Sequence, residues 1–228
     1  MRKTIFLISE MCRQGRSVWL VSLLFFSIYA TGQSEAERQA IMDALSENDR
    51  VTKEKWLAGD EDSPLTKEQQ EQFDGLSFYP VNPTYKVFAR IERDEEQQNV
   101  EVLKSNNVIT YLIRYGVVTF SIKGTVVALT IFRDQNLPEM ADTPGRFFIP
   151  FADMTTGYET SSLGRYLIFE RPANEMNFTL DFNKAINSFA EYNSEYVSVL
   201  PPKENYIPLE ITAGEKAFPN PREFYTGM

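Results

Sequence analysis

The sequence lacks histidine altogether and contains one cysteine, Cys12, among its 228 residues. Without imidazole, the chain has neither the commonest general base near neutral pH nor a usual ligand of zinc and copper. A lone cysteine forms no disulfide within the chain, so the fold must depend on its hydrophobic core. Catalysis would have to use carboxylate, Tyr, Lys, Ser, Thr or Arg side chains, or a hard cation held by oxygen ligands.

Recognisable ligand motifs are missing as well. The sequence contains no Asp-x-Asp-x-Asp-Gly calcium loop, no Gly-rich phosphate loop and no Gly-x-Ser-x-Gly nucleophile elbow. We therefore predict no metal site and no cofactor, and the sequence alone identifies no catalytic residue.

The chain begins with basic residues followed by an uncharged run. The early basic residues are Arg2, Lys3, Arg13 and Arg16. They precede an uncharged run from Val18 to Ala30, which is shorter than the roughly 20 residues that span a bilayer. This arrangement is typical of an export signal, which begins at Met1 or at Met11. We predict cleavage after Gly32 and an exported protein, periplasmic or extracellular, with no stable membrane anchor.

Removing residues 1–32 takes away four basic residues and one acidic residue, so the net charge changes from −9 to −12. A chain this acidic, with no Lys and Arg cluster, repels nucleic acid and anionic membrane surfaces. We predict no nucleic-acid partner. The sequence gives no indication of the oligomeric state.

Helical patterns come first in the predicted mature chain. Apolar residues recur near a helical period over residues 35–57, which predicts one or two amphipathic helices within an N-terminal segment, residues 33–62. Ser63-Pro64 then opens a second short helix, with Thr66 and Gln69 as a capping box, and this helix ends near Gly75.

After Gly75 the apolar pattern changes to a period of two. Seven short segments are rich in β-branched and aromatic residues: 87–91, 108–114, 117–122, 126–132, 147–149, 166–169 and 178–180. Tyr115-Gly116 and Lys123-Gly124 are predicted to form tight hairpin turns between them. No helical crossover interrupts the series. We predict a mainly β (α+β) fold, an antiparallel β meander curled into a barrel or sandwich, with one or two N-terminal helices.

The chain then ends in a polar segment with little regular pattern. We predict that this segment, which runs from Asp181 to Lys216, is an irregular C-terminal strap laid over the sheet. The single β-rich domain then covers residues 63–218, and residues 219–228 form a tail.

Several blocks of this β-rich part resemble those of one family. In order, they are FDGL (73–76), PTYKV (83–87), GRFFIPFADMT (145–155), GRYL (164–167), DFNKA (181–185), LPPKEN (200–205) and AGEK (213–216). Together they resemble the bacterial and archaeal domain-of-unknown-function family 1684 (DUF1684) over roughly residues 62–218. The resemblance implies no activity.

The chain departs from the family pattern at two positions. In many members of the family that this chain resembles, a motif similar to Asn-Pro-Pro-Cys follows the Asp-Phe-Asn block. A second cysteine stands shortly before Leu-Pro-Pro in those members. This chain has Ala190 and Ser198 at those places. A disulfide or metal role of those cysteines is therefore absent here.

The first group of candidate site residues lies around a polar loop between predicted strands. Asp153 and Thr155 begin this loop, and Arg165 begins the return strand. Loops held by a rigid scaffold often carry binding residues. The structural alternative is a turn in which Asp153 and Thr155 bond to the backbone while Arg165 pairs with a nearby carboxylate.

The second group of candidates follows the last predicted strand and consists of Asp181, Asn183, Asn187, Glu204 and Asn205. Such side chains can satisfy the backbone groups of a packed irregular segment, which would make them structural. Alternatively, Arg165, Asp181, Asn183 and Glu204 surround one pocket for a small polar ligand.

Two functions follow from these residues. The favoured hypothesis is a binding module for a small polar ligand. The alternative is a carboxylate-dependent hydrolase of an extracytoplasmic polymer or small ester, using Asp153 with Asp181 or Glu204 with Glu215. A hydrolase needs two carboxyls facing one cavity, at least one with a pKa raised by burial, whereas a binding module needs only satisfied polar groups. A surface-acting protein, a third class, would expose an apolar patch.

Overall fold

The structure is a computed structural model that describes residues 49–133 and 145–219. The predicted signal peptide, the first part of the helical segment and nearly all of the C-terminal tail lie outside the described residues and remain predictions. Within the described ranges, no helix combines the length and the apolar character needed to cross a membrane.

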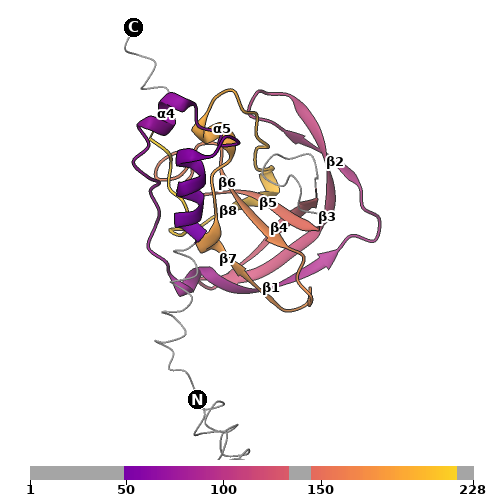
Figure 1. Ribbon diagram of the computed structural model, residues 1–228. Coiled ribbons are helices and arrows are strands. Elements are labelled where there is room, and N and C mark those ends of the chain that lie inside the picture. Colours follow the sequence, from indigo (N-terminus) through magenta and orange to yellow (C-terminus); the bar gives the residue numbers. More distant parts are fainter. Residues whose placement is uncertain (1–48, 134–144, 220–228) are drawn as a thin grey trace, which may run out of the picture. The chain divides into compact units, whose positions relative to one another are not determined.

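Helices lie at one side of the sheet (Figure 1). Residues 49–59 are helical, α4 spans Lys67–Glu71 and α5 spans Phe189–Tyr192. A small apolar cluster joins these helices, built on the buried side chains of Leu57, Leu65 and Tyr192.

The predicted capping box is confirmed. The Thr66 hydroxyl accepts a hydrogen bond from the Gln69 amide at 3.2 Å, and the Gln69 side chain accepts one from the Thr66 amide at 2.9 Å. The helix begins at Lys67, however, and not at Pro64. The Ser63 hydroxyl donates to the Leu57 carbonyl and accepts from the Leu65 amide, so residues 63–65 form a turn instead.

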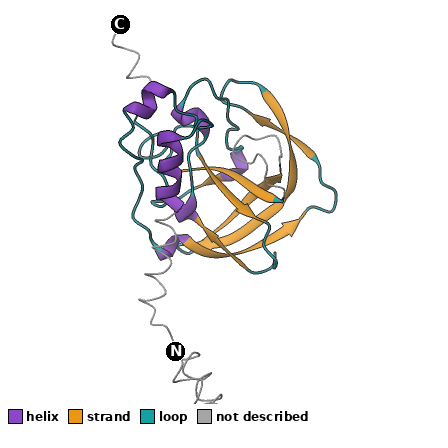
Figure 2. Ribbon diagram, in the orientation of Figure 1, coloured by secondary structure: helices purple, strands orange, loops and turns teal. Residues whose placement is uncertain are grey.

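Eight strands of the described residues form the sheet (Figure 2). They are β1 (Lys86–Arg93), β2 (Asn99–Leu103), β3 (Ile109–Ile122), β4 (Thr125–Arg133), β5 (Arg146–Asp153), β6 (Arg165–Glu170), β7 (Phe178–Asp181) and β8 (Tyr206–Ile207). Three short 3-10 helices, η1 (Pro83–Tyr85), η3 (Phe182–Lys184) and η4 (Lys203–Asn205), lie before β1, after β7 and before β8.

The sheet has the order β6-β5-β4-β3-β1-β7, with β2 paired to β3 and β8 paired to β5. Every pair is antiparallel except β5 with β8. The two ends of this order approach each other, because the rings of Phe169 in β6 and Phe178 in β7 stack with centroids 5.8 Å apart. The sheet is therefore curled into a half-barrel, and the predicted mainly β, antiparallel class is confirmed.

Alternation along the strands gives the sheet two apolar faces. Phe147, Ile149 and Phe151 of β5 face the main core inside the curl. Phe148 faces the other way and contacts a second cluster that includes Tyr166 of β6 and Val199 of the C-terminal strap. The strap therefore contacts the outer face at Val199, while Ile211 and Ala213 of the same strap belong to the main core.

The predicted hairpin turn at Tyr115-Gly116 is wrong. Strand β3 runs through both residues, and the pairing with β4 shifts there by a β-bulge between Arg114 and Gly116. Gly116 is needed because β1 passes very close: a Cβ atom at Gly116 would lie 2.2 Å from the Glu92 carbonyl oxygen. By contrast, Lys123 and Gly124 have positive φ angles of 48° and 79° and form the predicted turn between β3 and β4.

Candidate ligand-binding site

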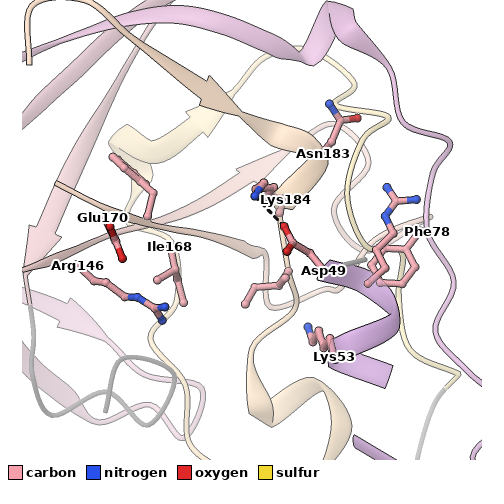
Figure 3. Close-up of a pocket in the computed structure, with 12 residues that line it drawn as sticks. Asp49, Lys53, Phe78, Arg146, Ile168, Glu170, Asn183 and Lys184 are labelled. Atoms are coloured by element: carbon pink, nitrogen blue, oxygen red, sulfur yellow. Dashed lines mark hydrogen bonds and ion pairs between the residues drawn. The ribbon is translucent and has the colours of Figure 1, made fainter. Parts of the chain in front are cut away.

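A cavity of about 500 Å³ lies beside β6, at one end of the strand order. It is lined by the helix at 49–59, by β5 and β6, and by the strap segment that follows β7 (Figure 3). The strap and β6 are joined at Tyr166 and Ile186, whose amides and carbonyls bond reciprocally at 2.8 and 3.0 Å. Beyond this bridge Ile168 and Glu170 line the cavity.

One part of the cavity wall is apolar. Phe78, Ile168, Phe169 and Ile186 contribute to it, and each is only partly buried. Ligand sites in proteins usually combine such apolar walls with a few placed polar groups.

The remaining wall carries more positive than negative charge. Its cations are Arg50, Lys53, Arg146 and Lys184, and its carboxylates are Asp49 and Glu170. Lys184 and Asp49 form an ion pair at 2.7 Å, with both side chains about half exposed. The Arg50 guanidinium lies over the Phe78 ring, 4.6 Å from its centroid.

Arg146 differs from the other cations. It is half-buried, and its guanidinium makes no hydrogen bond or ion pair with the part of the chain that the structure describes. Glu170 is its cross-strand neighbour in the β5–β6 register and is not within ion-pair distance. In Figure 3, Arg146 lies with Ile168 and Glu170, while Lys53 and Phe78 lie toward the other side of the view.

Lys53 is held by a buried network. Its ammonium donates to the Glu215 carboxylate at 2.6 Å and to the Tyr192 hydroxyl at 2.8 Å. Glu215 has no exposed surface and also accepts hydrogen bonds from the Tyr192 hydroxyl and from Asn187. Its backbone amide donates to the carbonyl of Ala185, another wall residue of the cavity.

The first group of predicted site residues forms a buried ion pair behind the strap. Arg165 and Asp153 meet at 2.6 Å, and both side chains are almost fully buried. The Arg165 guanidinium also donates to the carbonyls of Ile211, Ala213 and Glu215. The Asp153 carboxylate accepts from the amide and hydroxyl of Thr155. Arg165 therefore binds the strap backbone and pairs with Asp153, not with Asp181.

The second group is spread over several places. Asp181 pairs with Lys86 at 3.5 Å and accepts two hydrogen bonds from Asn183. Asn183 also exchanges hydrogen bonds with the backbone of Asn82, at 2.9 and 3.0 Å, and it lines the cavity. It is the one residue common to the predicted site and the described wall of this cavity.

The other members of the second group lie elsewhere. Asn187 is buried and donates to the Glu215 carboxylate and the Lys216 carbonyl. Asn205 is fully buried between β4 and β5. Glu204 is exposed. The structure therefore does not bring Arg165, Asp181, Asn183 and Glu204 together around one pocket.

Sequence reasoning missed all four cations of the described cavity wall. Arg146 and Lys184 belong to the GRFF and DFNKA blocks. Their place in blocks that resemble the family could have marked them as candidate site residues. Arg50 and Lys53 had no such signal, because their place on the cavity wall depends on how the helix packs.

The carboxylates on the cavity wall, Asp49 and Glu170, are not those of the predicted catalytic pairs. Burial raises the pKa of Glu191, which accepts from the Ser161 hydroxyl and lies near the negative charge of Glu215, but Glu191 does not line the cavity. None of the predicted pairs, Asp153 with Asp181 or Glu204 with Glu215, lines it either. Within residues 49–133 and 145–219 there is also no group of three or more acidic residues suited to hold a metal ion.

Ala190 and Ser198, the two positions singled out in the sequence, lie in contact. The Ala190 amide donates a hydrogen bond to the Ser198 hydroxyl at 3.2 Å. A hydrogen bond here links α5 to the strap segment before Leu200.

Comparison with known proteins gives a family and a fold. Residues 71–216 match the family described as "Protein of unknown function (DUF1684)". The solution NMR structure of an uncharacterised protein from the archaeon Haloarcula marismortui is similar, with a TM-score of 0.60 and 28% sequence identity. The match covers 79% of this chain and 96% of the archaeal chain. No curated protein matches the sequence.

Proposed function

Because this chain belongs to the DUF1684 family, whose description names no activity, we propose a function from the cavity itself: the protein binds a small organic anion there. The ligand's acidic group contacts Arg146, and its apolar part lies against Ile168 and Ile186. The protein acts in this proposal as a binding module.

The observation that carries the proposal is Arg146. A guanidinium presents five N–H donors and suits a carboxylate or phosphate in a two-point contact. Arg146 is half-buried on the wall of a cavity of about 500 Å³ and has no anionic partner among the described residues. An anion in the cavity would supply that partner.

The charge distribution supports the same ligand class. The chain has a net charge of −9, so its general field disfavours anions. Four cations nevertheless line this one cavity, against two carboxylates. The cavity is thus an exception on an acidic protein.

Fluorescence titration with 8-anilinonaphthalene-1-sulfonate, an aromatic organic anion, tests the proposal. We expect saturable binding that hexanoate displaces and that weakens with added salt. Arg146→Gln should weaken binding about 10-fold to 100-fold, since a hydrogen bond to a charged group contributes roughly 1.5–3 kcal/mol.

The matched control is Arg90→Gln, because Arg90 is an exposed arginine of β1 that does not line the cavity. This variant should bind the probe like the wild type. Equal affinities of the Arg146→Gln and Arg90→Gln variants would contradict the proposal, as would a failure of hexanoate to displace the probe.

A further inference from the structure

The acceptor sites of the Glu215 carboxylate are fully used by the protein. One oxygen accepts from the Tyr192 hydroxyl and from the Asn187 side chain, and the other accepts from Lys53 and from the Asn187 amide. A carboxylate offers about four lone-pair sites, so this group has no capacity left for a ligand. Glu215 can therefore influence a ligand in the cavity only by positioning Lys53.

Lys53 keeps one donor for the cavity. An ammonium group has three N–H donors, and Glu215 and Tyr192 take two of them. The Lys53 side chain is 16% exposed and lines the cavity. The two buried contacts fix the ammonium, so the third N–H is held in a constant position relative to a ligand.

Lys53 and Arg146 offer different chemistry. The charge of Lys53 is offset by Glu215 at 2.6 Å, whereas the Arg146 guanidinium has no carboxylate within ion-pair distance among the described residues. An acidic group of the ligand is therefore expected at Arg146. At Lys53 a neutral oxygen is the better match, because a second carboxylate would be repelled by the nearby Glu215 charge.

The cavity wall that carries these two groups is lined by both apolar and charged side chains. Figure 3 shows Ile168 next to Arg146 on one side of the view and Phe78 and Lys53 toward the other, with the Asp49–Lys184 ion pair drawn between the two sides. An apolar middle segment of a ligand would match the part of this wall formed by Ile168, Phe169 and Ile186.

We propose that the ligand is an oxygenated carboxylic acid: an acid group bound by Arg146, an apolar chain along the cavity, and a distal hydroxyl or keto oxygen that accepts a hydrogen bond from Lys53. Lys53 is the specificity-determining residue in this arrangement, and Glu215 is a positioning residue. The inference rests on the proposed function, since it specifies the anion that the same cavity takes.

Calorimetric titration of the full chain with three matched series tests the inference. The series are plain fatty acids, terminal hydroxy acids and dicarboxylic acids, each with four to ten carbons. At one chain length the hydroxy acid should bind about 10-fold more tightly than the plain acid of equal length, and more tightly than the diacid.

The double variant Lys53→Met/Glu215→Gln removes the donor together with its buried counterion, so that no lone charge is left inside. Whatever its affinity for plain acids, it should lose the 10-fold preference for the hydroxy acid over the plain acid of equal length. A preference that persists in this variant would overturn the role of Lys53.

The wild-type series decides the matter even if the variant does not fold. Plain acids that bind as tightly as hydroxy acids at every length would overturn the inference and leave the proposed function intact. Tightest binding of the diacids would also overturn it. If none of the acids binds, the proposed function itself is wrong.

Discussion

Asn205 shows how a single side chain can replace part of a β-ladder. Its amide oxygen accepts from the Thr130 amide at 2.7 Å, and its amide nitrogen donates to the carbonyls of Thr130 and Pro150 at 3.0 and 2.8 Å. Strands β4 and β5 pair directly at one position, Phe132 with Phe148. Pro150 has no N–H to offer β4, so the inserted amide joins the two strands there.

We expect Asn205→Asp to destabilise the protein by about 3 kcal/mol. The variant replaces a donor with a carboxylate oxygen that faces two buried carbonyl oxygens, and buried unsatisfied groups are costly. Urea unfolding measures the change in the free energy of unfolding. Asn177→Asp, at an exposed position, is the matched control and should change it by less than about 0.5 kcal/mol. Equal stability of the two variants would contradict this account.

For the individual Asn and Asp residues that follow β7, the sequence is compatible with two roles. They either hold the strap in place or bind a ligand. Asn187 and Asn205 make buried contacts of the first kind, and Asn183 both holds Asn82 and lines the cavity. Residue type alone cannot separate these roles, because the backbone groups that each amide meets come from distant parts of the chain. The role of Lys53 could not be predicted either, because its partner Glu215 lies 162 positions away in the sequence.

Among the elements, β3 depends on the absence of a side chain at Gly116. We expect Gly116→Ala to cost at least 2 kcal/mol, roughly the size of a steric core substitution, because the added methyl group would meet backbone atoms of Glu92 and Arg93 at 2.2 and 2.9 Å. Backbone atoms cannot move aside as a flexible side chain can.

Gly59→Ala provides the control. Gly59 is the last helical residue of 49–59, and nothing lies within 4 Å of its added Cβ, so this change should be neutral or slightly stabilising. Thermal melts of both variants measure the difference. A melting temperature of Gly116→Ala equal to that of Gly59→Ala would show that β3 and β1 can separate without loss.

The elements predicted well are those that local chemistry determines. The Thr66 capping box and the Lys123-Gly124 turn need only neighbouring residues, and alternation marked most strands. Three features depend on contacts far along the chain and were missed: the bulge at Gly116, strand β2, and β8. Strand β8 has two residues and exists through parallel pairing with β5. A glycine next to an aromatic residue fits a turn and a bulge equally well until the neighbouring strand is known.

For the molecule as a whole, the described strap and the sheet form one unit through Arg165. This side chain is 1% exposed, and it joins Asp153 at the end of β5 to three strap carbonyls. The strap's own amides continue the contact: Glu215 donates to the Ala185 carbonyl and Lys216 to the Ser77 carbonyl. The cavity wall at Lys53 depends on this strap, because Glu215 belongs to it.

We expect Arg165→Met to cost about 3–5 kcal/mol, the usual result of removing one partner from a buried ion pair. Arg165→Met/Asp153→Asn should recover part of that loss, since it leaves no buried charge, but the carbonyls of Ile211, Ala213 and Glu215 remain without their donor. Urea unfolding of the two variants separates the ion pair from the strap contacts.

Hydrogen exchange distinguishes strap release from general destabilisation. In the double variant the amides of Glu215 and Lys216 should exchange faster than in the wild type, while those of β3 keep their relative protection. Arg90→Met, an exposed arginine in β1, should change neither. Uniformly faster exchange across strap and sheet would mean that Arg165 stabilises the core in general and does not specifically hold the strap. If the strap alone is loosened, Glu215 no longer holds Lys53 in place. The Arg165→Met/Asp153→Asn variant should then lose the Lys53-dependent preference for hydroxy acids while its sheet is still folded.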